Sequence, residues 1–215
     1  PRGIGMEFKS HEHRFGSVLL RTEFPSAHEE IHEVISSITD EDIIKQHEEK
    51  HPKQKSISMA LNDLLRERFT FAGWDKESPI FADPEYQVNE TGRRDGVWRL
   101  DFANPDGSVS VEVSYNHGEA LAWNLLKPVL ASELNHVNKA IQTKLGVVIL
   151  ATEELKDAGG FDGAVGTYEK AIQYLLPLQS QLTVPLVLIG LNAPKTFWVE
   201  HVMVDDKKRA EFHKL

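Results

Sequence analysis

Asp101 and Glu112 are the two residues whose types and spacing point most clearly to chemistry. They lie in LDFANPDGSVSVEVSYNH, on either side of the turn sequence NPDG, so pairing of the flanking strands would bring both side chains to one edge of a sheet. Two carboxylates held close together repel each other unless a cation lies between them. Mg²⁺ prefers oxygen ligands and keeps several waters, so this pair would suit a metal-dependent nuclease. The alternative is that Asp101 makes a turn hydrogen bond and Glu112 points to solvent.

The segment HEEIH, His28 to His32, spells the HExxH pattern of zinc proteases, in which two histidines bind one metal and the glutamate activates water. Here the pattern opens a helix. Ser26 and Glu29 have the spacing of a capping box, and acidic residues are favoured in a first helical turn. No third ligand follows at a familiar spacing. We therefore favour an exposed helix face over a zinc hydrolase.

Two further segments could contact a ligand. DAGGFDGAVG, residues 157–166, is rich in glycine, but no Lys-Ser or Lys-Thr pair follows, so it does not predict a nucleotide-binding loop. It is interpreted as a flexible loop, with contact to a ligand or DNA as the alternative. GRRD, residues 92–95, carries Arg93 and Arg94 beside the hairpin. These arginines predict either phosphate contact or a solvated loop.

The elements that must position these residues follow from apolar periodicity and turn signals. Helices are predicted over residues 25–38 and 57–71, separated by a polar, exposed connection. A loop over residues 78–96 precedes the hairpin, and a helical segment over residues 119–144 contains Pro128, which is expected to kink or split it. Residues 146–151 and 184–191 are apolar runs typical of buried strands, with a helix near 167–181 between them and an edge strand at 196–204. This order predicts an α/β fold with a mixed central β-sheet flanked by helices.

Composition sets broad limits on the function. The length of 215 residues suits a single domain, residues 1–215, and PRGIG before Met6 is interpreted as a remnant of cloning. Without cysteine, a membrane span or an export signal, the chain is expected to be soluble and cytoplasmic. The net charge of −9 argues only weakly against a nucleic-acid partner, because a basic cleft can coexist with an acidic total.

An ordered series of segments resembles the BglII/BstYI group of type II restriction endonucleases, within the PD-(D/E)xK nuclease superfamily. The series runs HEEIHEVISSI, MALNDLLRERFTFAGWDKE, LDF, VEVSY, LKPVLASELNH, GVVILATEELK, YEKAIQ and VPLVLIGLNAP, and covers most of the chain from about Ser26 to Pro194. The resemblance implies a restriction-endonuclease-like core and a homodimer on double-stranded DNA. Each subunit would cut one strand of a short palindrome, built on a GATC core, with Mg²⁺.

The resemblance also implies roles for particular residues. Asp101 falls at the metal-binding aspartate, Glu112 at the metal-binding glutamate, and the backbone carbonyl of Val113 would be a further ligand. Glu77 falls near a further active-site group, which would bind the metal's water shell or accept a proton. Ser114 departs from the pattern, because the superfamily has lysine there and the nearest relatives have glutamine. A serine hydroxyl can still orient the attacking water but carries no charge, which leaves a DNA-binding protein without catalytic activity as an alternative.

Base and backbone contacts are predicted less specifically. Asn116 and His117 follow the second strand of the hairpin, and Lys139 lies on the predicted helical segment. Their side chains carry the donors and acceptors that major-groove readout requires. Together with Arg93 and Arg94 they are the predicted DNA-binding residues. By analogy with the relatives, a helix over residues 131–143 would serve the dimer contact.

Overall fold

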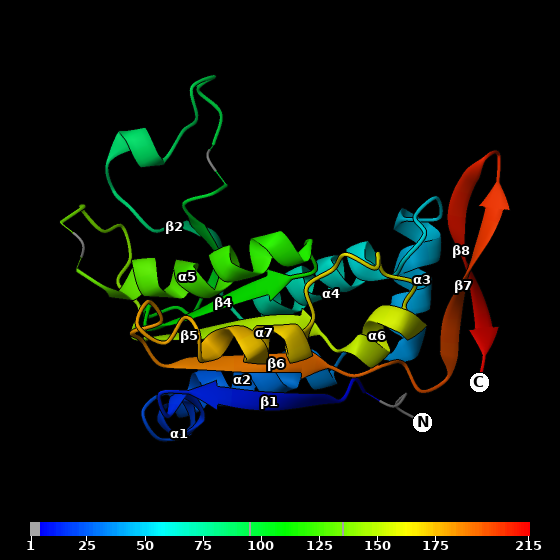
Figure 1. Ribbon diagram of the computed structural model, residues 1–215, viewed down its shortest axis with the longest axis horizontal. Coiled ribbons are helices and arrows are strands. Elements are labelled where there is room, and N and C mark those ends of the chain that lie inside the picture. Colours follow the sequence, from blue (N-terminus) through cyan, green and yellow to red (C-terminus); the bar gives the residue numbers. More distant parts are fainter. Residues whose placement is uncertain (1–4, 95, 135) are drawn as a thin grey trace.

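The computed structural model describes residues 5–94, 96–134 and 136–215 (Figure 1). Most of the predicted cloning remnant and residue 95 of the GRRD segment lie outside the described residues. The elements, in chain order, are β1 (Phe8–His13), α1 (Gly16–Thr22), α2 (Pro25–Ser36), α3 (Asp40–Lys50), α4 (Ser58–Phe71), β2 (Asp75–Pro79), the 3₁₀ turn η1 (Pro84–Tyr86), β3 (Arg99–Ala103), β4 (Val109–Ser114), the 3₁₀ turn η2 (Gly118–Ala120), α5 (Leu121–Ser132), β5 (Leu145–Ala151), α6 (Glu153–Ala158), α7 (Tyr168–Leu175), β6 (Leu186–Leu191), β7 (Phe197–Val204) and β8 (Lys207–Lys214).

Within the described residues, six strands form one mixed sheet in the order β1-β6-β5-β4-β3-β2. β4, β5 and β6 are parallel, whereas β1, β2 and β3 join the sheet by antiparallel pairing. In Figure 1 these strands are stacked from β1 at the bottom to β2 at the top. The predicted mixed sheet flanked by helices is therefore confirmed.

Helices cover both faces of this sheet, which explains why its central strands are apolar throughout. Successive residues of β5 alternate between two cores: Val147 and Ile149 pack with α2 and α4, whereas Val148 and Leu150 pack with α5 and α7. Figure 1 shows α5 and α7 lying along the strands on the same side. No helix of the described residues is both long enough and apolar enough to cross a bilayer.

The helical N-terminal half differs from the sequence-based expectation in two places. The predicted capping box of Ser26 and Glu29 is wrong, because α2 begins with Pro25 at its first position and has no side-chain cap. The predicted exposed connection after α2 is also wrong, because it contains α3. Thr39 and Asp42 form the capping box of that helix, each side chain accepting a hydrogen bond from the other's main-chain amide.

Among the described residues of the predicted helical segment 119–144 there is one α-helix and not two. α5 runs through Pro128 without a break and ends at Ser132, so the predicted helix over residues 131–143 is wrong. The described residues that follow are turns and extended chain, with Lys139 in an isolated bridge to Phe81. Gly146 of β5 explains how α5 sits so close to the sheet: a Cβ there would lie 2.3 Å from Cβ of Pro128. The missing glycine side chain makes room for the proline ring.

Two strands of the central sheet and one hairpin were not expected. β1 forms one edge, and β2 forms the other from residues predicted partly as loop. The predicted edge strand is β7, but it pairs with β8 in a separate two-stranded sheet. This hairpin stands beside α3 at the right of Figure 1. The ring of Phe212 contacts His47 of α3 there.

Candidate functional site

The β3–β4 pair opens at Asp101 and Glu112. Phe102 pairs with Val111 and Ala103 with Ser110, so the next step of the register places Asp101 opposite Glu112. At this step side chains replace the backbone ladder. The main-chain amide of Asp101 donates to Oε1 of Glu112 over 3.1 Å, and the amide of Val113 donates to Oδ2 of Asp101 over 2.8 Å. Each carboxylate satisfies an amide of the other strand, which holds the two acids together where the strands separate.

Burial gives this pair unusual electrostatics. Glu112 is 1% exposed, and burial, followed by the charge of Asp101, raises its pKa to about 8. Burial likewise raises the pKa of Asp101. Lys127 opposes both shifts, because its ammonium lies 2.6 Å from Oε2 of Glu112. A buried carboxylate pair with raised pKa values is stabilised by a cation, and such groups concentrate at functional sites.

The donor set suits a hard divalent cation that keeps part of its water shell. No cluster of three or more His, Cys, Asp or Glu side chains that could hold a metal occurs among the described residues, so Asp101 and Glu112 would provide two protein carboxylates only. Oδ1 of Asp101 accepts no hydrogen bond from the described residues. Two carboxylates with remaining positions for water and phosphate match the preference of Mg²⁺. The role of the Val113 carbonyl as a ligand stays a prediction.

Asp101 borders two hollows on the surface. One, of about 400 Å³, lies between the open strands and α4, and its lining includes Asn62, Arg66, Val113 and Asn116. The other, of about 340 Å³, is lined by Glu77, Arg94 and Arg99 among others. A substrate group entering either hollow would therefore reach Asp101. Glu112 lines neither and lies behind Asp101.

Glu77 is next to the acid pair, and its role at the site stays a prediction. The β2–β3 register matches Lys76 with Phe102 and Ser78 with Leu100, which puts Glu77 level with Asp101, in a left-handed conformation with φ of 51°. Its carboxylate accepts hydrogen bonds from Arg66 (3.3 Å) and Arg94 (3.0 Å). Partial burial works to raise the pKa of Glu77, but the two arginines outweigh it and hold the pKa below its ordinary value. An ionised, arginine-paired carboxylate is a poor proton acceptor near neutral pH.

Ser114 lies on the same face of β4 as Glu112 and is as deeply buried. Its Oγ accepts a hydrogen bond of 2.7 Å from Nδ2 of Asn124, itself buried in α5. Asn124 and Lys127 are one helical turn apart, so α5 gives one partner to Ser114 and one to Glu112. Neither α5 residue was predicted. The available signal was a lysine and an asparagine inside LAWNLLKPVLAS, an otherwise apolar helix.

The predicted DNA-binding residues fall into two groups. Asn116, His117, Arg93 and Arg94 are exposed, and Asn116 and Arg94 line the hollows beside Asp101. The glycine-rich loop also lies here, since the Gly166 amide donates to the Asn116 carbonyl. Lys139 differs: its ammonium donates to the Leu130 carbonyl and stands 4.9 Å from the centre of the Phe81 ring. It is directed into the protein and not toward the acid pair.

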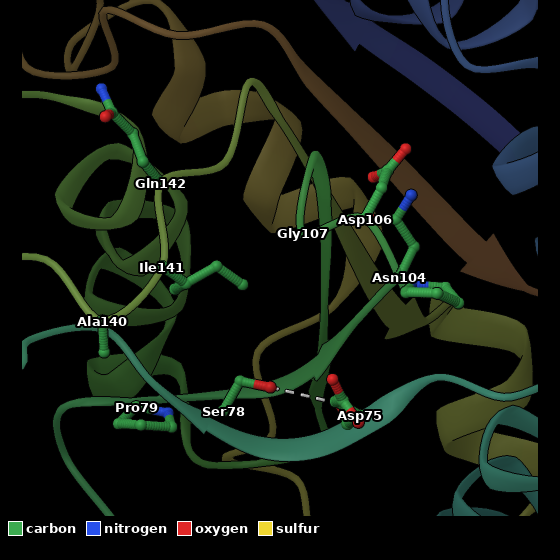
Figure 2. A pocket seen from close by; sticks show the side chains of 10 residues that line it. Asp75, Ser78, Pro79, Asn104, Asp106, Gly107, Ala140, Ile141 and Gln142 are labelled. Carbon is green, nitrogen blue, oxygen red and sulfur yellow. Dashed lines mark hydrogen bonds between the residues drawn. The ribbon is translucent and has the colours of Figure 1, made fainter.

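Two further features lie outside the predicted metal and DNA site. They are a third hollow, which contains no predicted site residue, and the HEEIH segment, which is the less favoured candidate for a metal site. The third hollow, of about 440 Å³, lies at the turn end of the hairpin, where Asp75 and Ser78 face residues 104–107 and 140–142 (Figure 2). The HEEIH segment lies on α2, with the rings of His28 and His32 4.3 Å apart. Among the described residues, no third His, Cys, Asp or Glu side chain joins these histidines in a group that could hold a metal.

A mixed sheet with a carboxylate pair where two of its strands separate is the arrangement expected of a restriction-endonuclease-like nuclease. The family model for the restriction endonucleases BglII/BglIII matches residues 8–191, and the chain therefore belongs to this family of type II, site-specific deoxyribonucleases. The fold is similar to the crystal structure of restriction endonuclease BglII complexed with a DNA 16-mer (17% identity, 97% of this chain and 90% of that chain covered, TM-score 0.60). It is also similar to the crystal structure of free BglII (15% identity, 97% and 93% covered, TM-score 0.53). No curated protein sequence matched the chain.

Proposed function

We propose that this endonuclease hydrolyses both strands of a short palindromic duplex with a GATC core, as a homodimer that requires Mg²⁺. The observation that carries the proposal is the acid pair, in which the carboxylates of Asp101 and Glu112 each accept a hydrogen bond from a main-chain amide of the opposite strand. The relative with the similar fold was crystallised with a DNA 16-mer. The GATC core and the dimer rest on the family resemblance of the sequence.

In the proposed mechanism the carboxylates of Asp101 and Glu112 and the Val113 carbonyl would hold Mg²⁺. When bound, the metal would supply Lewis acidity and lower the pKa of a water. Asp101 borders both hollows, so its carboxylate is the one that an entering phosphate would approach. Glu112 is buried and lines neither hollow. Glu77 orients solvent and keeps Arg66 and Arg94 beside the phosphate path. The Oγ of Ser114 accepts a hydrogen bond from Nδ2 of Asn124, so in this proposal Ser114 holds Asn124 in place and does not contact the attacking water directly.

DNA would be held by exposed groups around the two hollows. Arg93, Arg94 and the pair Asn116 and His117 stand on separate segments that meet beside Asp101. The arginines are suited to phosphate oxygens, and the amide and imidazole groups to base edges. Lys139 is left out of this set because its ammonium is already bonded within the protein.

Digestion of a plasmid of known sequence, with and without Mg²⁺, tests the proposal. We expect discrete fragments, only with the metal, whose mapped ends share a palindrome containing GATC. Discrete fragments at another sequence would retain the nuclease and reject the GATC core. Binding without cutting under all metal conditions would favour a catalytically silent binding protein on the same fold. Sedimentation at low salt would test the homodimer independently.

A further inference from the structure

Lys127 is a buried cation inside the candidate site that no motif assigns. Its side chain is 9% exposed, and Nζ lies 2.6 Å from Oε2 of Glu112. It projects from α5, whose Leu121, Leu125 and Val129 belong to the apolar core against β5 and β6. Lysine is almost never buried without a paired acid, so this ion pair fixes where both groups can lie.

Position 114 faces the same space. Residues 112 and 114 of β4 point to the same face of the sheet, and this face meets α5, which Figure 1 shows alongside β4. Ser114 is small, and Asn124 fills the volume beside it. A lysine at position 114 would enter the volume that Asn124 and Lys127 occupy. The serine on β4 and the lysine on α5 are therefore complementary.

We propose that Lys127 is a positioning residue that replaces, from α5, the lysine missing at position 114. The inference rests on the proposed function of the Asp101–Glu112 pair. Oε1 of Glu112 is held by the Asp101 amide and Oε2 by Lys127, so the whole carboxylate is oriented from both sides. The ammonium also places one positive charge behind two negative ones. It offsets part of the negative charge that accumulates when a phosphate approaches.

Three variants separate this role from that of a purely structural ion pair. Lys127→Met removes the charge, and Ser114→Lys combined with Lys127→Met returns an ammonium from β4. Lys156→Met is the matched control, because Lys156 is also a largely buried lysine paired with an acid, but its partner is Glu153 of α6 and not one of the acid pair. Cleavage is measured at saturating DNA and Mg²⁺, Ca²⁺ binding by calorimetry, and folding by thermal unfolding.

We expect Lys127→Met to lower kcat on the order of 10²-fold, the scale seen when one group that stabilises developing charge is removed. Its Ca²⁺ affinity should hold or increase, because a positive charge beside the ligand has been lost. The double variant should regain most of the cleavage, and Lys156→Met should cut like the wild type. If Lys127→Met does not fold, the proposal is tested with the double variant alone. A double variant that folds and cleaves DNA supports the proposal.

Other outcomes overturn it. Wild-type cleavage by Lys127→Met means that the ammonium is not needed. Loss of Ca²⁺ binding and cleavage together with a lowered unfolding temperature, or a folded double variant that stays inactive, assigns Lys127 a structural role only. A wild-type protein that never cuts DNA with Mg²⁺ is a different result, since it rejects the proposed function before Lys127 is tested.

Discussion

The amide of Asp101 donates to Oε1 of Glu112, so the Glu112 side chain spans the place where β3 and β4 would otherwise continue their ladder. In the other direction, the Val113 amide of β4 donates a hydrogen bond to Oδ2 of Asp101. The two acids are therefore held together by the fold itself before any cation binds. Their mutual repulsion is built into the native state, and binding of a cation relieves it.

This repulsion predicts how stability depends on pH and metal. The pKa of Glu112 rises from 4.5 to about 8 on folding, so its neutral form stabilises the native state fully below about pH 4.5. That contribution is lost as the pH rises through about 8. A divalent cation binds the ionised form, so added Mg²⁺ should raise Tm more at about pH 8 than at about pH 6. Equal shifts at both pH values would contradict the linkage, and Asp101→Asn should weaken the pH dependence.

The salt dependence of DNA binding should distinguish Arg93 from Lys139. Arg93 is exposed and directly precedes Arg94, which lines one of the two hollows. Arg93→Ala should reduce the slope of log K against log salt by about 0.9 if one phosphate contact is lost. Lys139→Met should leave the slope unchanged and lower Tm, because its ammonium bonds to the Leu130 carbonyl. Fluorescence anisotropy over a salt series measures both. A reduced slope for Lys139→Met would instead show that Lys139 contacts the DNA.

Glu77 should contribute by orientation and not by accepting a proton. Because its pKa is lowered by Arg66 and Arg94, it stays ionised through the neutral range. Glu77→Gln should reduce cleavage by less than the roughly 10²-fold that loss of a general base produces. The pH–rate profile should keep its shape. A profile that loses its acidic limb in Glu77→Gln would assign the proton transfer to this residue.

The close approach of α5 to the sheet gives a prediction about stability. Gly146→Ala would place a Cβ 2.3 Å from Cβ of Pro128, and a proline ring cannot move aside as a flexible side chain can. Overpacking of this kind destabilises by about 1–3 kcal/mol. Because α5 carries Lys127, cleavage should fall as well. Urea unfolding and a cleavage assay measure the two effects, and an unchanged unfolding midpoint would show that α5 is not held there by close packing.

The sequence-based predictions succeeded where a short segment identified its own element, or where the order of several segments resembled the family. The apolar runs of β5 and β6 and the NPDG turn each identify an element without help from the rest of the chain. α3 was missed because its polar sequence has a weak apolar face, and its start depends on Thr39 and Asp42. The segment after Ser132 was over-predicted as helix, because periodicity does not show that Lys139 instead pairs with Phe81.

Within the candidate site, the sequence predicted that the two acids lie together but not which residues surround them. Asp101 and Glu112 follow from the hairpin, since its register brings them opposite each other. Lys127 comes from α5, and only packing of that helix on β4 and β5 places its ammonium at Glu112. A contact between distant segments leaves no fixed spacing in the sequence. The one trace was a charged residue within an apolar helix.

Cleavage by Asp101→Asn tests the central claim most directly. The variant keeps the size of the side chain but removes the charge that a metal needs. In a plasmid assay with Mg²⁺, wild-type protein should give discrete fragments, whereas Asp101→Asn should give none yet still bind the duplex. Asp75→Asn is the matched control, because Asp75 is an exposed acid on the neighbouring strand β2. This variant should cut the plasmid as the wild type does. Wild-type fragments from Asp101→Asn would contradict the assignment of the acid pair as the catalytic metal site.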